Sequence, residues 1–211
     1  MSKTKKNNSS KFILSSIIVF FSVILFLSLP VLFNYNSIQN VIEKKVLSDF
    51  KINLKIIGNI SLKVFPKPYY LVEKANLDLN IENHKSSIIK SSNLKIYIPF
   101  KKIYSKSNIE VEAIELENVN LYFNMTDILD FRNHLYYKIN KPIYIKKSKF
   151  FLVDQNKKTI LISALKKIKY LINKKNNSKQ LKIDGNIFDV DYSSFWKRNY
   201  DKPNESSNEI R

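Results

Sequence analysis

Three aspartates near the C-terminus are the residues of this sequence that come closest to a chemical site. Asp184, Asp189 and Asp191 are near neighbours on one expected strand, and carboxylate oxygens at this spacing could bind a cation. The same spacing is also typical of a solvated strand face. The sequence places no nucleophile with a positioned general base beside them, so we expect a protein that is not an enzyme.

The composition removes further kinds of chemistry. The chain has no cysteine, which excludes disulfides, metal–thiolate sites and cysteine nucleophiles. Its only glycines are Gly58 and Gly185, which excludes phosphate-binding loops of the GxGxxG and P-loop kinds. His84 and His134 lie in polar stretches, and we expect neither to be catalytic or to bind a metal. We therefore expect no cofactor.

The chain is strongly basic, with a formal net charge of +18, and most of the excess lies in residues 132–211. Such a surface could meet nucleic acid or the anionic head groups of lipids. Few of the basic residues are arginine, the side chain that best reads bases and clamps phosphate. The abundance of Lys, Asn, Ile and Tyr also fits an AT-rich genome. We expect no nucleic-acid partner, and we leave a weak attraction to head groups open.

A long apolar segment determines where these residues would lie. Residues 12–33 carry no charge, and as a helix they would span about 33 Å, enough for the ~30 Å hydrocarbon core of a bilayer. Lysines precede the segment and no acid does, so we expect a cytoplasmic tail at residues 1–11 and the bulk of the chain across the membrane. The alternative is a cleaved signal peptide, whose apolar region is usually shorter and ends in a small-x-small site.

Beyond the apolar segment we expect one β-rich module at residues 34–200 and a disordered tail at residues 201–211. The module begins with an amphipathic helix at about residues 37–50, with Ser37 as its N-cap. We expect the apolar face of this helix to lie at the membrane surface. That face consists of Ile38, Val41, Ile42, Val46, Leu47 and Phe50.

After this helix the apolar residues alternate with polar ones, which predicts about eight consecutive strands. They cover residues 52–56, 60–64, 75–81, 94–98, 109–123 with a bulge at Ala113-Ile114, 143–154, 159–172 and 181–192 with a bend at Gly185. A turn at Gly58-Asn59 would join the first two strands into a hairpin. Residues 126–139 also fit a helix capped by Thr126, and residues 159–172 also fit a basic helix. No βαβ rhythm appears, so we expect an antiparallel sheet.

Such a sheet has one apolar face, which something must cover. A second sheet would give a sandwich, another chain could pack on it, or the sheet could curl into a trough that holds an apolar ligand. The apolar positions are almost wholly Ile, Leu and Val, a lining that suits acyl chains because each buried CH₂ gains about 0.8 kcal/mol. The pattern alone leaves the sandwich and the trough open.

The order of these features resembles a known family. A membrane helix and an amphipathic helix precede the turn at Gly58, the P-x-P break at Pro66 and Pro68, and the strand at residues 75–79, as in the bacterial AsmA-like envelope proteins. Residues 91–124 continue the likeness with a strand, a short basic connector and paired strands. The segments IYIKKSKFFLVDQNKKTI and LKIDGNIFDVDY resemble later strands of the same family.

The resemblance implies a mainly β fold with one transmembrane helix, a short amphipathic helix and a curved antiparallel sheet that forms an open hydrophobic groove. The AsmA-like family itself resembles chorein-type bridge proteins. The AsmA-like resemblance implies an inner-membrane anchor, a periplasmic body, and a role in phospholipid transfer or outer-membrane assembly. The implied partners are the membrane, phospholipid and other envelope proteins. Family members are usually several times longer, so this groove would be too short to bridge an envelope alone. We expect the groove to be lined by Ile60, Leu62, Val64, Leu77, Leu79, Ile81, Leu94, Ile96 and Ile98.

A second hypothesis stands beside the lipid groove. A membrane-anchored scaffold could bind a protein partner that adds a strand to an exposed edge of the sheet. The apolar face would then be closed, and the edge would carry the function.

Overall fold

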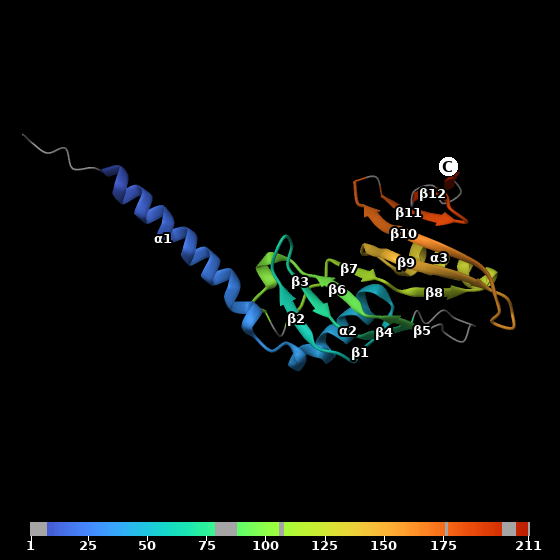
Figure 1. The fold of residues 1–211 in the computed structure, drawn as a ribbon, viewed down its shortest axis with the longest axis horizontal. Coiled ribbons are helices and arrows are strands. Elements are labelled where there is room, and N and C mark those ends of the chain that lie inside the picture. The colour runs from blue at the N-terminus through green and yellow to red at the C-terminus, as the bar shows by residue number, and fades with distance from the viewer. Residues whose placement is uncertain (1–7, 79–87, 106–107, 176, 200–205, 211) are drawn as a thin grey trace, which may run out of the picture.

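A computed structural model describes residues 8–78, 88–105, 108–175, 177–199 and 206–210. A long N-terminal helix, α1 (Asn8–Ser28), stands away from a body that is built mostly of strands (Figure 1). The prediction of a mainly β chain with an apolar N-terminal helix is confirmed.

The helix α1 is long and apolar enough to span a membrane. The candidate span covers Lys11–Leu32, and the side chains of residues 11–26 are all exposed. The helix tightens into a 3-10 turn, η1 (Leu29–Leu32), where Pro30 lacks the N–H that would continue the α-helical bonding. The buried Tyr35 donates its hydroxyl to the Pro30 carbonyl at 2.6 Å and so ties this end of the helix to the body.

The expected amphipathic helix is present and begins slightly later than predicted. A short 3-10 turn, η2 (Asn36–Ile38), leads into α2 (Gln39–Phe50). The helix ends at Lys51, which adopts a left-handed conformation with φ 56° and donates its N–H to the Leu47 carbonyl. This is the usual way in which the last carbonyls of a helix are satisfied.

The first half of the body is a meander of three long strands, each bent at the same corner. Each bent strand contributes one piece to a small sheet, in the order β1-β4-β5, and one piece to a large sheet. Strands that switch sheets at bends are how two packed sheets share a corner. The pieces are β1 (Asn53–Ile56), β2 (Ile60–Lys63), β3 (Tyr69–Val72), β4 (Ala75–Asp78), β5 (Ile88–Ser91) and β6 (Asn93–Tyr97).

The predicted hairpin at Gly58-Asn59 is wrong, because β1 pairs with β4 and β2 pairs with β3. The chain bends at Gly58 and continues without reversing. Ile57 and Gly58 both donate their N–H groups to the Lys74 carbonyl, at 2.9 and 3.0 Å. A Cβ on Gly58 would lie 2.8 Å from the Lys74 nitrogen, so glycine is needed here for the close approach of two backbones.

The large sheet continues through the second half of the chain and stays open, with β2 and β13 at its ends. Most neighbouring strands are antiparallel, as predicted, but β7 and β8 both run parallel to β9. A helix, α3 (Met125–Lys138), causes the exception because it carries the chain from the end of β8 to the start of β9. The further strands are β7 (Ala113–Glu117), β8 (Asn120–Phe123), β9 (Ile143–Val153), β10 (Thr159–Asn173), β11 (Ser178–Ile187), β12 (Val190–Asn199) and β13 (Ser206–Ile210).

The two ambiguous segments have different outcomes. Residues 159–173 are a strand, and α3 is a helix whose N-cap is Asn124 and not Thr126. The Asn124 side chain accepts the N–H of Asp127 at 2.9 Å, and the Asp127 carboxylate accepts the N–H of Asn124 at 3.1 Å. This reciprocal pair is a capping box, and it fixes where the crossover helix begins.

The expected bent strand at residues 181–192 is instead two strands that reverse at Phe188 and Asp189. Both residues have a positive φ, of 49° and 64°. Reversals of this kind favour Asn, Asp or Gly, and here only Asp189 is such a residue, while Phe188 is not, so the local turn signal is weak. The Asp189 N–H donates to the Asn186 side chain at 3.1 Å, which supports the reversal. Part of the expected disordered tail is also ordered, because β13 pairs with β12. An edge strand can form backbone hydrogen bonds without an apolar pattern in its sequence. The rest of the expected tail, residues 201–205 and 211, lies outside the described residues.

Candidate functional site

The residues expected to line a groove belong to the packed core. Seven of the nine lie in the described residues, and each of these is at most 5% exposed. They form one hydrophobic cluster with the buried side chains of α2 and of the small sheet, so this half of the large sheet is covered by its own chain. The seven are Ile60, Leu62, Val64, Leu77, Leu94, Ile96 and Ile98. Leu79 and Ile81 lie outside the described residues.

The helix α2 is likewise directed at the core. Of the side chains expected at the membrane surface, Ile38, Ile42, Val46 and Phe50 are buried. Val41 and Leu47 are exposed, at 37% and 42%. Most of the apolar face therefore packs on the body, where it belongs to the same hydrophobic cluster as the buried residues of the two sheets.

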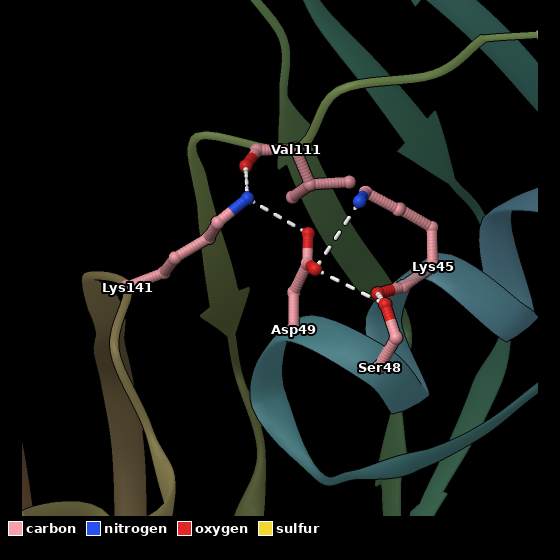
Figure 2. A network of polar contacts seen from close by, with 5 residues as sticks. All are labelled: Lys45, Ser48, Asp49, Val111 and Lys141. Atoms are coloured by element: carbon pink, nitrogen blue, oxygen red, sulfur yellow. Dashed lines mark hydrogen bonds and ion pairs between the residues drawn. The ribbon is translucent and has the colours of Figure 1, made fainter.

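A polar network fixes the last turn of α2 (Figure 2). Asp49 accepts a hydrogen bond from Lys141 at 2.7 Å and forms an ion pair with Lys45 at 3.2 Å. Lys141 also donates to the Val111 carbonyl. Burial alone would raise the pKa of Asp49, but the two lysines hold it below its ordinary value. The network joins α2 to the segments before β7 and β9, and thus to the second half of the body.

An apolar pocket lies in that second half, between α3 and the strands β8 to β12. Its volume is about 290 Å³, near the lower end of the range for small-molecule sites. It is walled mainly by aliphatic and aromatic side chains. They are Leu121, Phe123, Ile128, Phe131, Arg132, Phe150, Leu165, Ile168, Leu181, Ile183, Tyr192, Ser194 and Trp196.

Strand alternation and the crossover helix build this pocket together. On β11, Leu181 and Ile183 face the pocket, while Lys182 between them is exposed. On α3, Ile128 and Phe131 lie three residues apart and so share one face of the helix. The Phe131 ring lies 5.2 Å, centroid to centroid, from the Phe123 ring on β8.

Two buried side chains of the sheet hold the C-terminal end of α3. Tyr170 donates its hydroxyl to the carbonyls of Leu135 and Ile139, at 2.6 and 2.9 Å. The Lys179 amine donates to the carbonyls of Tyr136 and Ile139, both at 2.7 Å. A helix leaves such carbonyls without intrahelical partners. Burial lowers the pKa of Lys179 to about 8.

The pocket contains few polar groups. The Ser194 hydroxyl is buried without a hydrogen-bond partner among the described residues. The Tyr192 hydroxyl lies 2.9 Å from that of Ser163. The Arg132 guanidinium lies 6.0 Å from the centroid of the Trp196 ring. The arrangement suits an apolar chain with a polar or anionic end beside Arg132.

The opposite face of the large sheet is charged. Glu115 on β7 is almost fully buried between Lys95 on β6, at 2.9 Å, and Lys146 on β9, at 2.6 Å. Burial would raise the pKa of Glu115, but hydrogen bonds from Lys146 and Lys95 hold it below its ordinary value. The large sheet therefore has one apolar and one polar face, as the alternation predicts.

One loop of the body touches the end of α1. The Tyr104 hydroxyl donates to the Phe26 carbonyl, and the two rings lie 4.8 Å apart, centroid to centroid. Tyr104 follows a 3-10 turn, η3 (Phe100–Lys102), in which Phe100 is exposed. Exposed aromatic and basic side chains beside an apolar helix are typical of a membrane–water interface.

The aspartates and histidines do not form a common site. Asp184 accepts a hydrogen bond from Ser193 at 2.8 Å, and Asp191 forms an ion pair with Lys166 at 2.6 Å. Asp189 lies in the turn between β11 and β12. The described part of the chain contains no group of three His, Cys, Asp or Glu residues that could hold a metal ion. His134 is buried in α3, and His84 lies outside the described residues.

Sequence reasoning missed this pocket because residues 126–139 were ambiguous, so their helical face was not assigned as a wall of a site. The available signal was Asn124 followed three residues later by Asp127, which is the spacing of a capping box. No family profile and no curated protein matches the sequence. The AsmA-like resemblance therefore depends on the pattern of residues alone.

Proposed function

We propose that this chain is a membrane-anchored, AsmA-like protein that handles phospholipid and holds an acyl chain in the pocket under α3. The observation that carries the proposal is an apolar pocket of about 290 Å³ in a body whose N-terminal helix is long enough to span a membrane. Each methylene buried there would gain about 0.8 kcal/mol. The pocket walls contain too few polar groups to select a polar ligand.

The polar end of the bound lipid would lie beside Arg132. A guanidinium is weakly hydrated and binds carboxylate or phosphate oxygens through two parallel N–H groups. Inside the pocket, the open hydroxyl of Ser194 would donate to an ester carbonyl. Both contacts would orient the lipid, and the apolar walls would supply most of the binding free energy.

We further propose that α1 lies in a bacterial inner membrane, with the N-terminus in the cytoplasm and the body in the periplasm. The lysines that precede α1 support this orientation. The contact between Tyr104 and Phe26 would hold the body close to the bilayer, where it can exchange lipid. Phospholipid and other envelope proteins would be its partners in lipid transfer or outer-membrane assembly.

A pocket-filling variant tests the proposal. The full chain is purified in detergent, the detergent is removed in the mass spectrometer, and the fraction of protein that retains phospholipid is measured by native mass spectrometry. In Ile128→Trp the larger ring would fill the pocket from α3. We expect the wild type to retain phospholipid and Ile128→Trp to retain several-fold less, since each methylene displaced costs about 0.8 kcal/mol.

The matched control is Leu129→Trp, which adds the same ring at the next position of α3. Leu129 is 52% exposed, so this ring would lie in solvent and lipid retention should equal that of the wild type. A wild type that carries no phospholipid would overturn the proposal. Equal retention by the wild type and Ile128→Trp would do so as well.

A second candidate function follows from the end of the large sheet. Within the described residues β13 pairs with β12 alone, which leaves its other edge for a partner strand. The chain would then be a scaffold that binds a protein by strand addition. Removal of residues 206–211 should abolish capture of that protein and leave lipid retention unchanged, whereas Ile128→Trp should do the reverse.

A further inference from the structure

A hollow of about 520 Å³ lies on the charged face of the large sheet, which is the face opposite the apolar pocket under α3. Its floor is formed by side chains of β3, β6, β7, β9 and β10, and its rim includes Pro66 and Lys67 from the loop between β2 and β3. That loop lies on the side of the body from which α1 emerges (Figure 1). The hollow shares no lining residue with the apolar pocket under α3, so a ligand site here would be independent of the proposed function.

A bulge in β10 directs two lysines into the hollow. The register of β10 against β11 shifts between Leu165 and Lys167. Because of this shift, Leu165 and Ile168 both face the apolar pocket, while Lys167 and Lys169 both face the hollow. In the register with β9, Lys167 lies opposite Lys146.

The positive charges of the hollow are only partly neutralised. Lys146 is paired with Glu115. Lys167 and Lys169 form no ion pair within the described residues, although Asp184 lies opposite Lys167 on β11 and its charge acts on both lysines. The proximity of Lys169 lowers the pKa of Lys167, because each ammonium group disfavours the other. Two ammonium groups held together in a hollow would be stabilised by an anion between them.

Tyrosines supply neutral donors around the same hollow. The rings of Tyr69 and Tyr97 lie 5.5 Å apart, centroid to centroid, and Tyr144 lies on β9 beside Lys146. Burial raises the pKa of Tyr97 to about 12 and raises that of Tyr144. Their phenols therefore remain protonated at neutral pH. The Tyr97 phenol is hydrogen-bonded to the Glu115 carboxylate, and the Tyr144 phenol can donate to a ligand.

We propose that this hollow binds a phosphate group through Lys167 and Lys169, with Lys67 at its rim. A phosphate dianion has several acceptor oxygens, which suits convergent ammonium and phenol donors. The phosphate could belong to a lipid head group or to a small soluble phosphate, and the structure assigns their shared chemistry.

Binding to the full chain in non-ionic detergent tests this proposal by calorimetry. The two probes are inorganic phosphate and dihexanoyl phosphatidic acid below its micelle concentration. We expect saturable binding of at least one probe by the wild type. In Lys167→Gln/Lys169→Gln the affinity should fall at least about tenfold, as expected for the loss of charged hydrogen bonds.

Two further variants show whether the effect is local. Lys157→Gln/Lys158→Gln removes the same charge from the exposed turn between β9 and β10, and its affinity should equal that of the wild type. Glu112→Gln removes an exposed carboxylate from the wall of the hollow, and its affinity should rise. Lys167→Gln/Lys169→Gln should melt no earlier than the wild type, because the substitution removes a repulsion.

The outcomes separate the sources of phosphate. Tighter binding of dihexanoyl phosphatidic acid assigns the hollow to lipid head groups, and tighter or equal binding of inorganic phosphate assigns it to soluble phosphates. No saturable binding of either probe would overturn the proposal, as would equal losses in both double-lysine variants. Retention of phospholipid in the apolar pocket under α3 is measured separately, so the two proposals can fail independently.

Discussion

The buried amine of Lys179 lies 2.7 Å from the carbonyl of Ile139, the C-cap residue of α3. Lys179 is near the start of β11, and β11 supplies Leu181 and Ile183 to the floor of the apolar pocket. The same strand therefore forms the floor of the pocket and fixes the helix that covers it. The position of α3, and thus the shape of the pocket, depends on this contact.

Replacement of Lys179 by Met should destabilise the protein. The side chain would keep its apolar part and lose the donor for two buried carbonyls, of which the Ile139 carbonyl still receives the Tyr170 hydroxyl. We expect the free energy of unfolding to fall by about 1–3 kcal/mol, the cost of a buried group left without a partner. Urea denaturation measures it, with the exposed Lys182→Met as the control, whose surface ion pair should contribute little. Equal losses in both variants would contradict the role given to Lys179.

The stability of the wild type should also rise between pH 8 and about pH 9.5. The pKa of Lys179 is about 8 in the folded protein, against the ordinary lysine value of 10.5 that the unfolded chain should show. In this interval the unfolded chain binds more protons than the folded one, so the free energy of unfolding increases with pH. The neutral amine still has donors for both carbonyls.

Urea denaturation at a series of pH values measures this dependence. Lys179→Met should show a much shallower rise over the same interval, to which Lys167 still contributes because its pKa is also lowered. The series should stop below pH 10, because burial raises the pKa of Tyr136 to about 12 and the unfolded tyrosines ionise first. A wild-type profile that falls between pH 8 and pH 9.5 would contradict the prediction.

The periodicity of the sequence predicts most strands, because each element with one apolar face carries that alternation locally. Ile52, Leu54 and Ile56, for example, are buried at alternate positions as expected. The same pattern cannot say which strand pairs with which. Gly58 has the sequence character of a turn residue, although its role is set by Lys74, sixteen positions further along the chain.

The candidate site was harder to predict than the fold. Ile96 and Ile183 both alternate with polar neighbours, yet Ile96 is in the closed core and Ile183 faces the pocket. What separates them is the covering layer, which is tight over β6 and incomplete under α3. Coverage is a property of tertiary packing, and local sequence carries little information about it.

The buried Glu115 should be a source of stability that acid removes. Its pKa lies below the ordinary value of 4.5, so its contribution is present above pH 4.5 and is lost as the pH falls through the folded pKa. Glu115→Gln should lose about 1–3 kcal/mol at pH 7, because Lys95 and Lys146 would face each other without the carboxylate. Below pH 4.5 the difference from the wild type should shrink.

Chemical denaturation at pH 7 and pH 3 measures this difference. Glu110→Gln is the control, since Glu110 pairs with Lys101 at 3.6 Å on an exposed surface, and such pairs contribute about 0–1 kcal/mol. The prediction fails if Glu115→Gln is no less stable at pH 7 than Glu110→Gln.

The corner of the bent sheet should tolerate no side chain at Gly58. A Cβ there would meet the Lys74 backbone nitrogen at 2.8 Å, and backbone cannot move aside without breaking the paired strands. We expect Gly58→Ala to cost about 1–3 kcal/mol, as overpacking does elsewhere. Gly185→Ala meets only the far end of the Tyr192 side chain, at 2.6 Å, and should cost less because that side chain can move by a change in χ1. Thermal melting of both variants ranks their losses of stability. A larger loss for Gly185→Ala than for Gly58→Ala would argue against the role given to Gly58 at the corner.

Two adjacent serines on β12 should respond in opposite directions to the same substitution. Ser193 donates to the Asp184 carboxylate at 2.8 Å, so Ser193→Ala should lower the free energy of unfolding by about 0.5–1.5 kcal/mol. The Ser194 hydroxyl is buried in the apolar pocket without a partner among the described residues, so Ser194→Ala should raise the stability of lipid-free protein, by about 1 kcal/mol. The gain should shrink when lipid is bound, because an ester carbonyl would then accept from this hydroxyl. Melting temperatures with and without added phospholipid measure both effects, and an equal gain in the two states would show that bound lipid does not reach Ser194.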